Sequence, residues 1–200
     1  MGLVKAKITQ GPIDEAAARP AELDAADAAS RRAAARVMAT RPGSEGDLLS
    51  RLAVETDRQV REAIVLSLIG LGTEVAVLGL AEHLGGEDVE LRNAVVEALE
   101  SMPRALEPHL DRLLVHDDAD VRIFVCNVLA GLRHAGACEW LKRVLERDRH
   151  PNVCAAAIDA MMEAGTPDCI PSIRAAMARF PDEPFLAFSA ELAIARIERP

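Results

Sequence analysis

The sequence predicts an all-α protein, an α-solenoid of about five antiparallel helix pairs. Three observations predict it: an internal repeat of 30 to 33 residues, apolar residues at helical spacing within each repeat, and short joints between the apolar segments. A fixed period of this size is typical of solenoids, in which each repeat packs only against its neighbours.

One column of branched apolar residues marks the repeat, at Val60, Leu91, Val121, Val153 and Leu186. Three positions before each of them stands a side chain that can accept a hydrogen bond: Asp57, Asp88, Asp118, His150 and Glu183, with Asp27 one period earlier. Such a side chain can bind the free N–H groups of the next turn, so this position is predicted to be a helix N-cap. Pro151 and Pro184 follow the last two, and proline is favoured at the first position of a helix.

Each repeat holds two predicted helices. After the column, apolar residues recur with a period near 3.6, which indicates the first helix of each pair. Second, shorter helices are predicted at 75–84, 107–116, 138–147 and 170–179. Joints such as LGT and AGTPD are short enough to make each pair antiparallel.

Composition excludes several classes of function. The net charge is −9, lysine occurs three times and aromatic residues make up 2% of the chain, so a nucleic-acid surface is not expected. No apolar run is long enough to span a membrane, and no secretory signal stands at the N-terminus. We therefore expect a cytoplasmic protein that binds neither nucleic acid nor membrane.

No motif for catalysis or metal binding stands out. Cys126, Cys138, Cys154 and Cys169 form no CxxC pair, so they are interpreted as small buried thiols rather than zinc ligands or a disulfide framework. No nucleophile–base pair or phosphate-binding glycine motif occurs. We expect no catalytic residue, no metal site and no cofactor, and an enzyme is the less favoured interpretation.

The series DRQVR, DVELR and DADVR, at a period of about 31 residues, resembles HEAT-repeat proteins of the short-repeat type first noted in phycobilisome bilin lyases. The resemblance implies a right-handed solenoid whose Asp and Arg side chains form a structural ladder along the inner layer. Carried over, the ladder residues are Asp57, Arg61, Asp88, Arg92, Asp118 and Arg122. Cys154 and Ala187 replace the arginine in the last two repeats, so the ladder is in doubt there.

The chain is predicted to have one solenoid domain, 21–200, after an N-terminal tail or arm, 1–20. Residues from about 165 to 200 are expected to form a capping repeat, because terminal repeats are often atypical. Phe180, Phe185 and Phe188 gather there. They are expected to close the core, or alternatively to make an end-on contact with a partner or a second copy.

The first helices of HEAT repeats line the concave face, so positions pointing away from their apolar seam are candidates for binding. These positions vary between repeats while the seam stays constant, as on a binding surface built on a regular scaffold. The candidates are Glu62, Asn93, Glu97, Glu100, Ile123, Asn127, Asp159 and Phe188. The alternative is that they are merely solvated.

Two functions are compatible with these observations. The first is a non-enzymatic scaffold or adaptor that binds another protein, as a monomer or an end-on homodimer. The second, implied by the resemblance alone, is a bilin-lyase-like subunit or a maturation factor for a cofactor-bearing protein. Deoxyhypusine hydroxylase, another HEAT-type protein, holds iron with His-Glu pairs, and this chain contains no His-Glu dipeptide.

Overall fold

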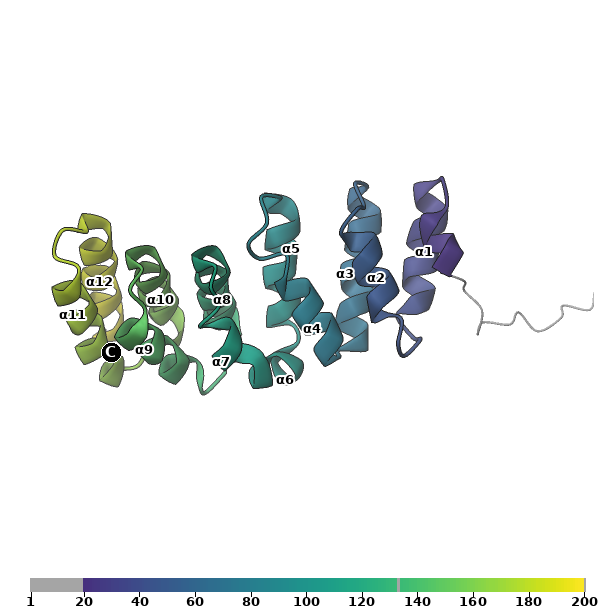
Figure 1. Cartoon of the computed structure of the whole chain (residues 1–200). Coiled ribbons are helices and arrows are strands. Elements are labelled where there is room, and N and C mark those ends of the chain that lie inside the picture. The colour runs from purple at the N-terminus through teal and green to yellow at the C-terminus, as the bar shows by residue number, and fades with distance from the viewer. Residues whose placement is uncertain (1–19, 133, 200) are drawn as a thin grey trace, which may run out of the picture.

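The computed structural model describes residues 20–132 and 134–199, and every regular element in these ranges is a helix. Figure 1 shows the helices stacked side by side along one direction, as in an α-solenoid. The predicted all-α solenoid fold is confirmed. The predicted N-terminal arm, apart from Pro20, lies outside the described residues.

The helices form two layers. The first layer contains the first helix of each pair, and neighbours in this series contact each other: α1 (Ala28–Met38), α3 (Arg58–Leu71), α5 (Val89–Glu100), α8 (Ala119–Gly131), α10 (Pro151–Ala164) and α12 (Pro184–Ile197). The second layer contains α2 (Glu45–Leu52), α4 (Glu74–Ala81), α6 (Pro103–Leu106), α7 (Leu110–Leu113), α9 (Ala137–Arg147) and α11 (Ile170–Arg179). The described residues also contain the short 3-10 helices η2 (Pro20–Asp24), η3 (Glu107–His109) and η4 (Pro167–Cys169).

The predicted column of branched residues forms the core between the layers. All five of its members are buried: Val60, Leu91, Val121, Val153 and Leu186. Because one position of each repeat is buried against the next repeat, the apolar core runs continuously along the stack. The period of 30 to 33 residues in the sequence therefore reflects a buried position that recurs in each repeat.

The predicted N-caps are confirmed in the first four helices of the first layer. Asp27, Asp57, Asp88 and Asp118 each accept hydrogen bonds from backbone N–H groups at the start of their helix, for example from Leu91 N to Asp88 Oδ1 at 3.0 Å. His150 and Glu183 stand at the same position but make no capping bond. There Pro151 and Pro184 begin the helices, as expected, and a proline at this position has no N–H group to cap.

One predicted helix is wrong. The segment 107–116 does not form a single helix but is divided into η3 and α7, after the separate short helix α6. Pro108 lies within η3, and proline can neither donate a backbone hydrogen bond nor fit inside a regular helix. The predictions for 138–147 and 170–179 agree with α9 and α11 to within one residue.

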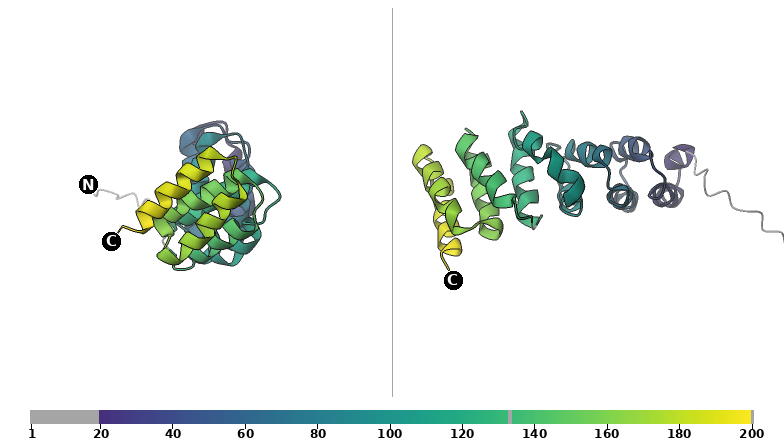
Figure 2. Two further views of the ribbon diagram at one scale, coloured as in Figure 1. Left: turned by 90° about the vertical axis from the view of Figure 1, so that its left-hand side faces the viewer. Right: turned by 90° about the horizontal axis from the view of Figure 1, so that it is seen from below.

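The orientation of the helices changes between α5 and α8, next to the broken second-layer helix. Seen from below, the helices of the N-terminal half are viewed nearly end-on, whereas those from α8 to α12 lie across the view (Figure 2). Within the described ranges, no helix is long and apolar enough to cross a membrane.

Candidate functional site

In the first four helices of the first layer, an arginine near the start of the helix closes the loop that leads into it. Its guanidinium donates to the carbonyl oxygen six residues earlier, at 2.6 to 2.9 Å: Arg31 to Ala25, Arg61 to Glu55, Arg92 to Gly86 and Arg122 to His116. These carbonyls belong to loops and have no partner in a regular helix, so the arginine satisfies them. The repeated arginine thus has the same local structural role at the start of these four helices.

Three of these arginines also reach an acid of the following repeat. Arg31 pairs with Glu55 at 2.8 Å, Arg61 with Asp88 at 2.8 Å and Arg122 with Asp148 at 2.7 Å. The guanidinium of Arg92 instead lies over the ring of Phe124, 4.5 Å from its centroid. Among these arginines, only Arg61 therefore binds the N-cap aspartate of the following repeat.

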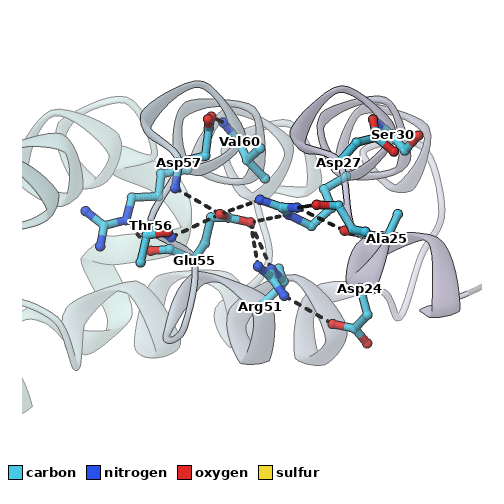
Figure 3. Close-up of polar contacts among 12 residues, drawn as sticks. Asp24, Ala25, Asp27, Ser30, Arg51, Glu55, Thr56, Asp57 and Val60 are labelled. Carbon is cyan, nitrogen blue, oxygen red and sulfur yellow. Dashed lines mark hydrogen bonds and ion pairs between the residues drawn. The ribbon is translucent and has the colours of Figure 1, made fainter.

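The pair at Glu55 is the most buried of the three. The Glu55 carboxylate, whose side chain is fully buried, accepts hydrogen bonds from Arg31, Arg51 and the backbone N–H groups of Thr56 and Asp57 (Figure 3). Hydrogen bonding to Arg31, helped by the other donors, lowers the pKa of Glu55 from 4.5 to about 2, against the opposing effect of burial. This cluster ties α1, α2 and α3 together.

In the fifth repeat a different arginine occupies the ladder position. Cys154 stands where the earlier repeats have arginine, and Arg179, from the end of α11, donates to Asp148 O at 2.9 Å and Glu146 O at 3.3 Å. Its guanidinium also lies 3.3 Å from the Cys154 sulfur. Asp148 O, in the loop before α10, thus accepts a hydrogen bond from the second helix of the pair, whereas in the earlier repeats the donor is an arginine of the first helix.

Asp88 both caps α5 and pairs with Arg61. Comparing two substitutions of Asp88 separates the contribution of the cap from that of the ion pair. We expect Asp88→Ala to lower the free energy of unfolding by about 1 kcal/mol through loss of the cap. Asp88→Asn keeps an oxygen acceptor for Leu91 N, and the exposed ion pair that it loses contributes little. Urea unfolding of both variants should therefore show a much smaller loss for Asp88→Asn; equal losses would contradict the capping role.

The interpretation of all four cysteines as free thiols is wrong for two of them. Cys138 and Cys169 form a disulfide, whereas Cys126 and Cys154 are free and buried. The two bonded residues are 31 positions apart, which is one repeat, so the stacking of α9 against α11 places them side by side. In the sequence, the disulfide is therefore indicated by the separation of one repeat between Cys138 and Cys169, and not by the spacing between neighbouring cysteines.

The remaining thiols are poor nucleophiles. Burial raises the pKa of Cys126 to about 12 and also raises that of Cys154, so both stay protonated near neutral pH. Cys138, Cys169 and Asp168 lie close enough together to suggest a metal site, but the two sulfurs are bonded to each other and are not thiolate ligands.

The outward surface of the first layer is here called the first-helix face, and five of the eight predicted partner-binding residues, Glu62, Asn93, Glu97, Asn127 and Phe188, are exposed. Glu62, Asn93 and Glu97 are exposed and line a groove of about 500 Å³ between α3 and α5. Asp159 lines a smaller groove of about 220 Å³ between α10 and α12. The structure thus groups four of the eight predicted residues in two grooves, near the two ends of the stack.

The other four predicted residues lie outside these grooves. Ile123 is half-buried, Asn127 is exposed and Phe188 is 64% exposed. The carboxylate of Glu100 packs so closely against Gly131 of α8 that a β-carbon there would lie 2.3 Å from it. Burial, with Glu97 nearby, raises the pKa of Glu100.

The stacked helix pairs and their repeated cap-and-arginine joint define an α-solenoid. Residues 106–195 match the family model described as HEAT repeats, so this part of the chain consists of HEAT repeats.

The solved structures that are similar to the chain include the following two. One is human deoxyhypusine hydroxylase in complex with glycerol, with 18% identity, a TM-score of 0.48, and coverage of 88% of this chain and 82% of that chain. The other is the complex of CpcE and CpcF of phycocyanin lyase from Nostoc sp. PCC7120, with 17% identity, a TM-score of 0.39, and coverage of 98% and 100%. No curated protein sequence matches the chain.

Proposed function

We propose that the protein is a non-enzymatic scaffold that binds another protein through the first-helix face, which the resemblance to HEAT proteins makes the concave face. The observation that carries the proposal is the groove between α3 and α5, which combines the exposed apolar side chain of Leu66 with exposed carboxylates. A partly apolar groove edged by charge is typical of a surface that binds a protein segment.

The apolar part of the groove comes from Leu66, which is 60% exposed, and the half-buried Ile69. Exposing a leucine to water is unfavourable, so covering Leu66 with a partner's apolar side chain would stabilise a complex by about 1 to 2 kcal/mol. Leu66 occupies a position that carries Glu97, Asn127, Asp159 and Leu192 in the later repeats. An exposed leucine at this position is therefore not constant in the repeat.

The charged part of the groove is acidic. Arg58 and Arg61 are engaged by Glu90 and Asp88, at 2.9 and 2.8 Å. This leaves the exposed carboxylates of Glu62 and Glu97 facing solvent along the groove. A partner segment with apolar residues flanked by lysine or arginine fits this arrangement, because exposed charges bias the choice of partner and speed association.

The C-terminal end of the face offers a second apolar surface. Phe185 and Phe188 are each 64% exposed and Leu192 is 49% exposed, all three on α12. Leu192 also lines the smaller groove with Asp159. A long partner lying along the first layer would contact both grooves.

A pair of double variants tests the proposal. We expect Leu66→Ser with Glu97→Lys to lose a partner captured from the source cell, because both the apolar contact and the acidic charge are removed. Val75→Ser with Glu87→Lys makes the same chemical changes at exposed positions away from the groove, and is expected to retain that partner. Quantitative mass spectrometry of the captured proteins compares the two, and circular dichroism checks that both variants are folded. Equal capture by both variants would rule out the groove.

The alternative, a bilin-lyase-like subunit or a maturation factor, stays a prediction of the sequence resemblance. It predicts that an absorbing ligand purifies with the protein, which an absorbance spectrum above the protein band would show. A colourless preparation that still captures its partner through the groove favours the scaffold.

A further inference from the structure

A pocket of about 520 Å³ lies on the second layer, between α7 and α9, and extends to the loops that precede α8 and α10. Four arginines contribute to its walls: Arg122, Arg143, Arg147 and Arg149. They come from three separate places in the fold, so the stacking of two repeats brings them together. Nothing in the repeat pattern indicates this cluster, because the last three lie outside the repeated joint.

Two of the four arginines are already paired. Arg122 forms two hydrogen bonds with the Asp148 carboxylate, at 2.7 and 3.2 Å, and Arg143 lies 2.8 Å from the Asp111 carboxylate. Arg147 and Arg149 are exposed and form no ion pair with any residue of the described ranges. Two guanidinium groups, each able to bind a carboxylate with two parallel hydrogen bonds, therefore remain available at the pocket.

His116 adds a further donor to the wall. Its Nδ1 accepts a hydrogen bond from the backbone N–H of Asp118 at 3.1 Å, so in the neutral ring the proton is on Nε2. With three aspartates in the walls, the four arginines leave a small positive excess, in a chain whose net charge is −9. The pocket thus has a small positive charge, although the protein as a whole is acidic.

The rest of the pocket is apolar. Trp140 lines it, and a hydrogen bond of 3.1 Å from its indole Nε1 to Asp111 helps hold the ring in place. Val115 is 69% exposed beside it. A ligand that fills this pocket would therefore place an apolar group near Trp140 and Val115 and anionic groups near Arg147 and Arg149.

We propose that this pocket binds an acidic segment of a protein partner, in which carboxylates flank an apolar side chain. A peptide fits better than a nucleic acid, because the three aspartates in the walls would repel a continuous phosphate backbone and a single aromatic ring offers little stacking. The pocket lies on the opposite layer from the α3–α5 groove and selects the opposite charge. It is independent of that groove, and together the two surfaces would let the chain join two different proteins.

Intrinsic fluorescence gives a direct test, because Trp140 is the chain's single tryptophan and the chain contains no tyrosine. We expect a short peptide of alternating glutamate and leucine to change the Trp140 emission in a saturable way, and the binding to weaken as salt is added. The matched peptide with glutamine in place of glutamate is expected to bind about tenfold more weakly or not at all.

Arg147→Gln with Arg149→Gln is expected to weaken binding of the glutamate peptide by at least about tenfold, while Arg104→Gln, at an exposed position on α6, leaves it unchanged. Circular dichroism checks folding of each variant. No response to millimolar peptide, or undiminished binding by the Arg147/Arg149 variant, would overturn the proposal. An equal response to inorganic phosphate would show a simple anion site, and tighter binding of a single-stranded oligonucleotide would show a nucleic-acid site; either result overturns the peptide assignment.

Discussion

Replacing Glu55 by alanine is expected to lower the free energy of unfolding by about 3 to 5 kcal/mol, the cost of breaking a buried ion pair by removal of one partner. The substitution leaves the guanidinium groups of Arg31 and Arg51 without their shared carboxylate, in side chains that are only 12% and 18% exposed. It also removes the acceptor for the backbone N–H groups of Thr56 and Asp57. Urea unfolding followed by circular dichroism measures the loss.

Asp24→Asn is the matched control for the Glu55 variant. Asp24 also pairs with Arg51, at 3.3 Å, but its side chain is 75% exposed, so we expect a change of less than about 0.5 kcal/mol. A similar loss of unfolding free energy in Glu55→Ala and Asp24→Asn would show that the burial of Glu55 does not strengthen its contribution to stability. Glu55→Gln should fall between Glu55→Ala and the wild type, since an amide oxygen can still accept hydrogen bonds.

The lowered pKa of Glu55 also predicts how stability depends on pH. Because the folded-state pKa is about 2 and the ordinary value is 4.5, the contribution of Glu55 is fully present above about pH 4.5. It is lost as the pH falls from about 4.5 towards about 2. The difference in unfolding free energy between wild type and Glu55→Gln should therefore shrink over this range in acid titrations, and a difference that stays constant would contradict the lowered pKa.

Reducing the disulfide between Cys138 and Cys169 is expected to destabilise the protein by about 3 to 4 kcal/mol. The bond closes a loop of one whole repeat, so it removes conformational entropy from the unfolded chain. Thermal unfolding with and without a reductant measures the effect. A variant with both residues changed to alanine is the control, and its midpoint should not respond to the reductant.

Alkylation identifies the bonded cysteines directly. When the protein is denatured without reductant and alkylated, mass spectrometry should find labels on Cys126 and Cys154 alone. Labels on all four cysteines would show that the bond is absent from the purified protein. In that case no effect of reductant on the unfolding midpoint is expected either.

Most of the architecture follows from the sequence because its determinants act within one helix or between identical positions of neighbouring repeats. An aspartate at the repeated cap position caps its own helix, and it does so at Asp27, Asp57, Asp88 and Asp118. The buried column from Val60 to Leu186 is visible for the same reason, since burial recurs with the repeat. The break in the predicted helix 107–116 is signalled in the sequence by Pro108, which lies inside that segment.

The candidate site depends much more on the tertiary structure. The sequence predicted which positions of the first layer point outwards, but the two grooves appear only once α3 is placed against α5 and α10 against α12. The second-layer pocket was not predicted at all. Arg147 and Arg149 have no periodic counterpart, so nothing in the repeat distinguishes them from other exposed arginines.

By itself, the sequence determined that the chain forms stacked helix pairs, where most of the helices begin, and which side of each first helix is buried. Hydrogen bonds within a helical turn and a repeated apolar position decide these features, and both are local or periodic. Only the tertiary structure decided that Arg31 meets Glu55, that Arg122 meets Asp148, that Arg179 takes the place left by Cys154, and that Cys138 bonds Cys169. Each of these contacts joins residues 24 to 31 positions apart. Whether such side chains meet depends on how one repeat is rotated against the next, and that rotation is set by the packing of many side chains together.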